Sequence, residues 1–362
     1  MRRRTFLKQA AAGVATTAIA TPAVAQTPAQ VRWRMTTSWP KSLDTIYGSA
    51  VAMCQRIGQL TDGKFQISAF AGGEIVPATQ AFDAVSKNSV ECGHTLTAFY
   101  FGKNPVYAFD SGVAFGANSR QQAAWLYYGG GMEVLREIFR REDLINFPCG
   151  NTGVQMGGWF RKEIKSVDDL RGLKMRIGGF AGTILAKLGL VPQQLAAGDI
   201  YPALEKGTLE ACEWVGPHDD EKLGFYKVAR YYYYPGWWEG CGQAHNLINL
   251  AKWNELPKAY QSAIQTASGD AWEWVIGKYD YANPAALKRL LAQGVQLRAF
   301  PQDVMEASYK AALDIYAELS NTNPMFKKLY DSLVAYRGDS LVWLQVAELS
   351  FDSFMMRMRT RT

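Results

Sequence analysis

The 362-residue sequence has few of the side chains on which most metal and nucleophilic sites depend. Its three histidines are His94, His218 and His245, so a histidine-based metal site would need most of them at once. It contains neither a Gly-x-Ser-x-Gly elbow nor a Gly-Lys-Ser/Thr phosphate loop. The usual sequence motifs of an α/β-hydrolase and of a P-loop protein are therefore absent. The segment His218-Asp219-Asp220 is interpreted as a surface turn.

Cysteine is also sparse, and its spacing matches no metal or redox motif. The five cysteines form no Cys-x-x-Cys pair, and none has a histidine at zinc-finger spacing. An odd number leaves at least one thiol without an intramolecular partner. Cys54 falls on the apolar face of an expected helix, so we expect these residues to be mostly buried small hydrophobes. The five are Cys54, Cys92, Cys149, Cys212 and Cys241.

The sequence has no run of the roughly 20 apolar residues that a membrane helix needs and no basic block that would indicate nucleic-acid binding. The N-terminus instead has the twin-arginine arrangement Arg3-Arg4-x-Phe6-Leu7-Lys8, followed by a short Ala-rich stretch and the small-x-small site Ala23-Val24-Ala25. Residues 1–25 are therefore predicted to be a signal peptide for twin-arginine export to the periplasm. Its removal lowers Lys plus Arg from 39 to 35 against 33 acids, so the net charge falls from +6 to +2.

The first third of the remaining chain alternates between strand and helix patterns. Strands are expected at residues 31–36, at 65–69 and from about residue 90, with helices at about 43–60 and 79–87. This alternation is typical of an open α/β sheet. Further on, the patterns predict a helix near 121–140 broken at Gly129–Gly131, strands at 153–156, 173–176 and 211–214, and helices at 181–188 and 201–206.

The C-terminal part is expected to be helical, with apolar residues three and four apart at 304–319, 326–334 and 341–354. We predict an α/β fold with two lobes joined by a hinge, as in periplasmic binding proteins, and with long C-terminal helices. The first lobe is expected to comprise 26–150 with about 246–300, and the second 151–245. Residues 301–362 are expected to form the C-terminal helices and to mediate dimerisation.

One arginine stands where such folds bind ligands. Arg176 ends an expected strand and is followed by Gly178 and Gly179, and open α/β sheets bind ligands outside the carboxyl ends of their strands. Arginine can donate two parallel hydrogen bonds to a carboxylate, and the glycines allow close backbone approach. Taken alone, Arg176 could equally be a surface ion-pair partner. Glu213 and Glu239 could in principle be a glycosidase pair, although their sequence separation is a weak signal.

Arg176 lies within a longer stretch that resembles a known family. Residues 176–192, then Asp199-Ile-Tyr201-Pro-Ala-Leu204-Glu-Lys-Gly207-Thr-Leu-Glu210, resemble the signature region of the periplasmic receptors of TRAP transporters, the DctP-type family. Residues 168–174 and 72–75 also fit, and the resemblance covers roughly residues 31–315. One departure is Glu210-Ala211, where the family has an acidic residue followed by glycine.

Within the family the chain looks most similar to the branch that binds 2-oxo acids or lactate with a metal ion. The features that carry this likeness are Gln155, Glu213-Trp214 and Trp237-Trp238-Glu239. The resemblance implies that a cation is held by the side chains of Gln155, Glu213 and Glu239, by the carbonyl of Trp214, and by the substrate. It also implies that Arg176 holds the substrate carboxylate, with Gln155 and Trp214 beside it. A hydroxyl from Tyr100 is expected to join them.

All of these ligands are oxygens, which suits a hard cation. Two glutamates, one substrate carboxylate and one arginine sum to −2, so calcium would neutralise the site, whereas the resemblance favours sodium. We therefore expect Na⁺, with Ca²⁺ as the alternative. The expected protein is a receptor and not an enzyme: it binds a small pyruvate-like 2-oxo or 2-hydroxy monocarboxylate, delivers it to TRAP membrane permease subunits and forms a homodimer. The alternatives are a receptor for a larger dicarboxylate or sugar acid, and a periplasmic hydrolase that uses Glu213 and Glu239.

Overall fold

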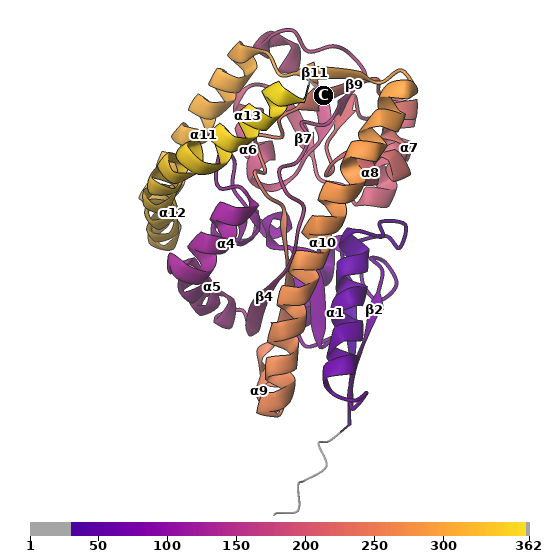
Figure 1. Cartoon of the computed structure of the whole chain (residues 1–362), viewed down its shortest axis with the longest axis vertical. Helices are drawn as coiled ribbons and strands as arrows, with labels where there is room; N and C mark the ends of the chain where they lie inside the picture. The colour runs from indigo at the N-terminus through magenta and orange to yellow at the C-terminus, as the bar shows by residue number, and fades with distance from the viewer. Residues whose placement is uncertain (1–29, 360–362) are drawn as a thin grey trace, which may run out of the picture. The chain divides into compact units, whose positions relative to one another are not determined.

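The computed structural model describes residues 30–359 and contains two sheets, each covered by helices (Figure 1). The first sheet has the strand order β2-β1-β3-β10-β4. β1 pairs in parallel with β2 and β3, and β10 is antiparallel to β3 and β4. Its strands are β1 (Val31–Thr37), β2 (Phe65–Phe70), β3 (Cys92–Leu96), β4 (Leu144–Asn151) and β10 (Gln243–Asn249). The predicted early strands are therefore confirmed, while β4 and β10 were not predicted.

The second sheet has the order β11-β9-β5-β8-β6-β7. Its strands are β5 (Trp159–Phe160), β6 (Lys174–Arg176), β7 (Val191–Gln193), β8 (Ala211–Cys212), β9 (Tyr231–Tyr234) and β11 (Gln296–Ala299). The strand expected at 153–156 does not form, because Gly153 and Gly158 have φ of +72° and +87°, which interrupt an extended chain. We call the first sheet with its helices the first lobe and the second sheet with its helices the second lobe.

The assignment of residues 246–300 to the first lobe needs a correction at its end. β11 pairs in parallel with β9, from Gln296 opposite Tyr231 to Ala299 opposite Tyr234, so residues 296–299 belong to the second sheet. Local apolar pattern does not report which strand is the partner, so only the folded chain decides this point. The remaining lobe boundaries stay a prediction, and the predicted signal peptide, residues 1–25, lies outside the described residues.

The helices of the first lobe follow the predicted pattern. The helix predicted near 121–140 is two helices, α4 and α5, separated at Gly129 and Gly130, and Gly130 has a φ of +82°. The helical segments of this lobe are α1 (Ile46–Leu60), α2 (Ala81–Ser86), α3 (Ala108–Ser111), α4 (Ser119–Tyr128), α5 (Gly131–Arg140), and the 3-10 turns η1 (Ala78–Gln80), η2 (Thr97–Tyr100) and η3 (Pro105–Tyr107). All five cysteines are buried, as expected, and all five are free.

The second lobe contains α6 and α7 where helices are predicted, and α8 where the surface turn is predicted. That interpretation of His218-Asp219-Asp220 is wrong: Asp219 and Asp220 are buried in α8, because tyrosine, tryptophan and threonine donors satisfy their carboxylates. The helical segments are η4 (Val167–Leu170), α6 (Gly179–Lys187), α7 (Ala197–Glu205), α8 (Pro217–Leu223) and η5 (Phe225–Lys227).

One long helix links the two lobes. After α9 (Leu250–Glu255), α10 (Lys258–Ala292) packs against α1 and β4 in the first lobe and against α8 in the second (Figure 1). Its buried residues, such as Ile264, Ala271 and Tyr279, recur at helical spacing along its length. Because it contacts both lobes, α10 helps to position the two sheets on either side of a shared cavity.

The C-terminal helices are α11 (Gln302–Thr322), α12 (Pro324–Leu344), a π-helical turn (Gln345–Leu349) and α13 (Ser350–Met358). α12 lies beside α4 and α5 (Figure 1). Phe326, Leu329 and Leu333 on α12 are buried in the main core cluster, so the first half of this helix packs on its own chain. Within the described residues, no helix is both long enough and apolar enough to span a bilayer.

Candidate functional site

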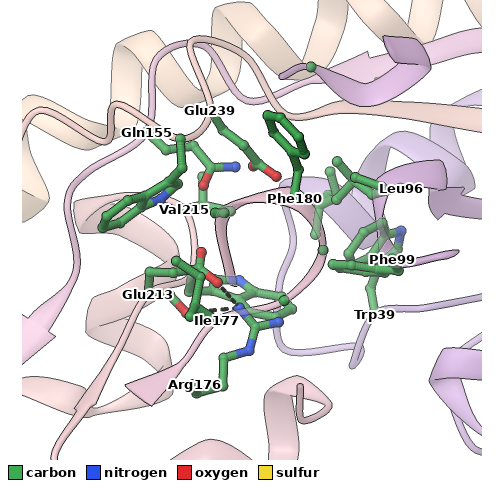
Figure 2. A pocket seen from close by; sticks show the side chains of 18 residues that line it. Trp39, Leu96, Phe99, Gln155, Arg176, Ile177, Phe180, Glu213, Val215 and Glu239 are labelled. Atoms are coloured by element: carbon green, nitrogen blue, oxygen red, sulfur yellow. Dashed lines mark hydrogen bonds and ion pairs between the residues drawn. The ribbon is translucent and has the colours of Figure 1, made fainter. Parts of the chain in front are cut away.

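A cavity lies between the two lobes, with an empty volume of about 670 Å³ that includes its opening to solvent. Residues of the first lobe, mostly apolar, form one wall, and strand ends and loops of the second lobe form the other (Figure 2). The first-lobe residues are Trp39, Ile46, Leu96, Ala98, Phe99 and Gly112. The second-lobe residues are Gln155, Arg176–Ala181, Glu213–Val215, Trp238 and Glu239. The site therefore requires residues that are up to about 200 positions apart in the sequence.

Arg176 and Glu213 meet because their strands are neighbours. β6 and β8 are parallel with Arg176 opposite Cys212, so both residues lie at the carboxyl ends of their strands. The Arg176 guanidinium donates through Nη1 to the carbonyl of Glu213 at 3.0 Å and to its carboxylate, and through Nε to the carbonyl of Leu195 at 3.2 Å. It also lies over the ring of Trp214, 4.9 Å from the centroid. This side chain is thus held at the cavity wall on several sides.

Gln155 and Glu239 come from two loops that pair through their backbones. The N–H of Gln155 donates to the carbonyl of Glu239 at 3.2 Å, and the N–H of Gly236 donates to the carbonyl of Gln155 at 2.9 Å. A Cβ on Gly236 would lie 2.6 Å from that carbonyl oxygen, so only glycine allows this approach. Figure 2 shows Gln155 and Glu239 together, with Arg176 and Glu213 in the other half of the cavity.

The two carboxylates are unequal in their partners. Glu213 is ion-paired with Arg176, although burial still raises its pKa. Glu239 makes no ion pair within the described residues. Glu239 is half-buried, and it lines the cavity. Burial, with the charge of Glu213 as the second cause, raises the pKa of Glu239 to about 8. The site therefore holds one more acidic group than it has cationic side chains to pair.

Several buried polar atoms of cavity residues have no hydrogen-bond partner within residues 30–359. They are Gln155 Oε1, Trp214 Nε1 and Trp238 Nε1. Buried polar groups are normally satisfied, so unpaired ones that line a cavity indicate a missing ligand. An unpaired amide oxygen in a cavity that two carboxylates also line fits a hard cation. The described residues contain no cluster of three His, Cys, Asp or Glu side chains that could hold a metal ion. A cation here would thus need the amide of Gln155 and a backbone carbonyl in addition to Glu213 and Glu239.

The structure brings most of the predicted site residues together, with one exception. Arg176, Gln155, Glu213, Trp214 and Glu239 all line the cavity. Tyr100 does not: its hydroxyl accepts a hydrogen bond from the N–H of Phe82 at 3.0 Å and its ring packs on Phe82 in the core. Tyr100 lies in the last position of η2, and the turn of that short helix directs Ala98 and Phe99 to the cavity instead.

The first-lobe wall was not found from the sequence. Trp39 and Phe99 line the cavity, and Phe180 joins them from the N-terminal turn of α6. The usable signal was position: Trp39 is the second residue after β1, at the carboxyl end of a strand in a parallel pair. A lone tryptophan after a strand is too common a pattern to identify a site without the fold.

A two-lobed α/β chain with a cavity between its lobes, lined by arginine and carboxylates, defines the class of extracytoplasmic solute-binding proteins. The chain belongs to the DctP family, bacterial extracellular solute-binding protein family 7, which matches residues 35–323. It is 48% identical over 360 residues, 98% of this chain and 99% of the other, to a protein from Nostoc sp. named as a monocarboxylate 2-oxoacid-binding periplasmic protein.

Two solved TRAP solute-binding proteins have closely similar folds. One is from Bordetella bronchiseptica, with 54% identity and a TM-score of 0.91 over 92% of this chain and 99% of that one. It is described as a dimer of mixed occupancy, with copurified calcium and picolinate in one active site and an apo second site. The other is from Pseudoalteromonas atlantica, with 36% identity and a TM-score of 0.86 over 90% of this chain and 99% of that one. It is described with bound sodium and pyruvate. The predicted family and two-lobed fold are confirmed.

Proposed function

We propose that this chain is the receptor of a TRAP transporter and that it binds a pyruvate-like 2-oxo or 2-hydroxy monocarboxylate together with a cation. Arg176 would donate to the ligand carboxylate, and Gln155, Glu213, Glu239 and the Trp214 carbonyl would hold the cation. The cation would neutralise carboxylates that otherwise repel each other and would join the ligand's oxygens to the second lobe. We propose Na⁺ with Ca²⁺ as the alternative, since one similar protein carries each.

A single observation carries the proposal: one arginine and two glutamates converge with an unpaired amide oxygen at a cavity between two lobes. Among the residues that the structure describes, Arg176 is the one cationic side chain that lines this cavity. A dicarboxylate or acidic sugar would need a second cationic partner or more polar groups. The apolar first-lobe wall supports a small monocarboxylate instead.

The same contacts favour a receptor over a hydrolase. A general base must be free to accept a proton from water or substrate, whereas Glu213 is engaged with Arg176. A receptor needs no such base, and it closes on its ligand by moving the lobes together. We propose that the ligand-bound closed form is what the membrane permease subunits recognise, and that the chain reaches the periplasm by the twin-arginine route. Turnover of a sugar or lactone by the purified protein would contradict this assignment.

Calorimetry with pyruvate, in the presence of Na⁺ or Ca²⁺, tests the proposed site. Arg176→Ala should weaken binding by at least about 100-fold, because each hydrogen bond to a charged group contributes about 1.5–3 kcal/mol. Arg176→Lys should be intermediate, because it retains the charge and loses the planar fork. Arg171→Ala is the control, since Arg171 is exposed on the same lobe and pairs only with Asp168 at 3.1 Å. Equal affinity of Arg176→Ala and wild type would refute the site.

We further propose a homodimer through the second half of α12 and α13. This segment exposes a series of large apolar side chains that the described chain leaves uncovered. They are Leu341, Val342, Trp343, Val346, Leu349, Phe351, Phe354, Met355 and Met356. A similar protein is described as a dimer, which supports a second copy as the partner.

Removal of residues 345–362 tests the dimer without disturbing the core. The cut spares Phe326, Leu329 and Leu333, which are buried against the rest of the chain, whereas a cut near residue 321 would remove them. The shortened protein should sediment as a monomer with an unchanged fold by circular dichroism. Sedimentation as a dimer at the same concentration as wild type would place the interface elsewhere.

A further inference from the structure

A tryptophan of the first lobe packs against the aromatic ring that supports Arg176. Trp39 lines the cavity and is 1% exposed. Its ring meets that of Trp214 edge to face, with centroids 6.3 Å apart and an interplanar angle of 76°. Trp214 in turn supports the guanidinium of Arg176. Trp39 is therefore part of the first-lobe surface against which Trp214, the aromatic support of Arg176, rests.

His94, which is fully buried in β3, holds the indole of Trp39. Trp39 Nε1 donates to His94 Nδ1 at 2.8 Å. An indole N–H can only donate, so His94 Nδ1 is unprotonated and the imidazole hydrogen is on Nε2. Nε2 lies 3.3 Å from both Ser49 Oγ and the carbonyl oxygen of Cys149, which can accept it. Burial lowers the pKa of His94 to about 4, in agreement with a neutral ring.

The surroundings of His94 allow only this arrangement. Ser49 Oγ donates its own hydrogen to the carbonyl of Ile46 at 2.8 Å, which leaves the oxygen free to accept from His94. The N–H of Ser38 donates to the carbonyl of His94 at 3.1 Å, which ties the residue preceding Trp39 to the same strand. Both the indole and its adjacent backbone are thus fixed by one residue.

The other two cavity tryptophans differ from Trp39 in the hydrogen bonding of their indole N–H groups. Trp214 and Trp238 also line the cavity, but their Nε1 atoms have no partner in the described part of the chain. Trp39 alone among these three has its indole orientation set by the protein before any ligand is present. A rigid wall in one lobe lowers the ordering cost when the other lobe closes onto it.

We propose that His94 is a positioning residue of the ligand site, which acts by accepting the hydrogen bond of Trp39 and so fixing the wall that meets Trp214 and Arg176. His94 makes no contact with the cavity itself, since it is not among the residues that line it. This inference rests on the proposed function, because its effect is measured as affinity for a 2-oxo acid.

The experiment compares pyruvate affinity, by calorimetry with Na⁺ or Ca²⁺, in four variants. His94→Leu removes the acceptor and should weaken pyruvate binding about three- to tenfold, because the freed Trp39 side chain must then be ordered on binding. His94→Asn places an amide oxygen near the Nδ1 position, so its affinity should stay within about twofold of wild type. Trp39→Phe should lose about as much as His94→Leu. The control Ser49→Ala alters only the Nε2 side of the ring and should bind as wild type does.

The decisive measurement is the double variant. If His94 acts through Trp39, adding His94→Leu to Trp39→Phe causes no further loss of affinity. If His94 had a purely structural role, His94→Leu would cause the same loss of affinity in wild type and in Trp39→Phe, and that result overturns the proposal. Wild-type affinity in Trp39→Phe, or in a folded His94→Leu variant, overturns it as well. If His94→Leu does not fold, His94→Asn decides: affinity as low as that of Trp39→Phe overturns the proposal. A wild-type protein that binds no 2-oxo acid would overturn the proposed function and this inference with it.

Discussion

Cation binding at this site is expected to depend on pH through one carboxyl group. Without a cation, Glu239 has a pKa of about 8, caused by burial and by the charge of Glu213. At pH 7 the group is therefore about 90% protonated, and a cation must displace that proton before Glu239 can bind it. The affinity for Na⁺ or Ca²⁺ should rise about tenfold between pH 6 and 7, less steeply around pH 8, and become nearly constant above about pH 9.

Titration calorimetry in two buffers of different ionisation enthalpy measures the released proton directly. About 0.9 protons per cation are expected at pH 7 and about 0.1 at pH 9, since release follows the protonated fraction of the free protein. Glu239→Gln has no proton to release and should show weaker binding with no pH slope. Glu213→Gln should keep the slope at lower pH, because the charge of Glu213 contributes to the raised pKa. A flat wild-type profile from pH 6 to 9, or an unchanged slope in Glu239→Gln, would refute the reasoning.

The same group affects the stability of the cation-free protein in the opposite direction. The folded-state pKa of Glu239 is raised from 4.5 to about 8, so the folded chain retains a proton that the unfolded chain releases. Its contribution to the free energy of unfolding is present below pH 4.5 and is lost as the pH rises through 8. Cations should therefore stabilise the protein most at high pH.

Two further substitutions separate the site from its surroundings. Tyr100→Phe should lower the free energy of unfolding by about 1–3 kcal/mol, because the buried N–H of Phe82 loses its acceptor. Pyruvate affinity should be unchanged, and weaker binding would show that the hydroxyl does reach the ligand. Gly242→Ala would place a methyl group 2.5 Å from Gln155 Nε2 and 3.1 Å from Glu239 Oε2, and it should weaken cation binding about 10- to 100-fold. Gly269→Ala, whose methyl group would meet nothing within 4 Å, is the control, and equal cation affinity in the two variants would contradict the role of Gly242.

Much of the secondary structure follows from local pattern. Alternation at 31–36 and helical spacing up to Leu60 predict β1 and α1, because burial on one face imposes the period of each element. α10 is the longest helix of the described residues, yet it was not predicted. Its buried positions do recur at helical spacing, but many of them are small or polar, such as Ala267, Ser268 and Ala271, so the apolar signal along the helix is weak. β11 likewise follows from its partner β9 and not from its own residues.

The site residues also divide into those that the sequence predicts and those that only the structure places. Arg176 was identified from local sequence because a strand end followed by two glycines is a pattern with a physical meaning, and the resemblance to TRAP receptors supplied Gln155, Glu213, Trp214 and Glu239. Tyr100 is adjacent to Phe99 and two positions after Ala98. Only the turn of η2 decides that Ala98 and Phe99 face the cavity while Tyr100 enters the core.

The sequence by itself determined the family, the elements with one buried face and the chemical types at the site, because these depend on residue identity and short spacing. The tertiary structure alone decided which residues share the cavity, that Glu239 has no ion-pair partner among the described residues, and that Trp39 donates to His94. These facts depend on strands and loops far apart in the chain lying side by side, and short-range periodicity carries no information about such pairings.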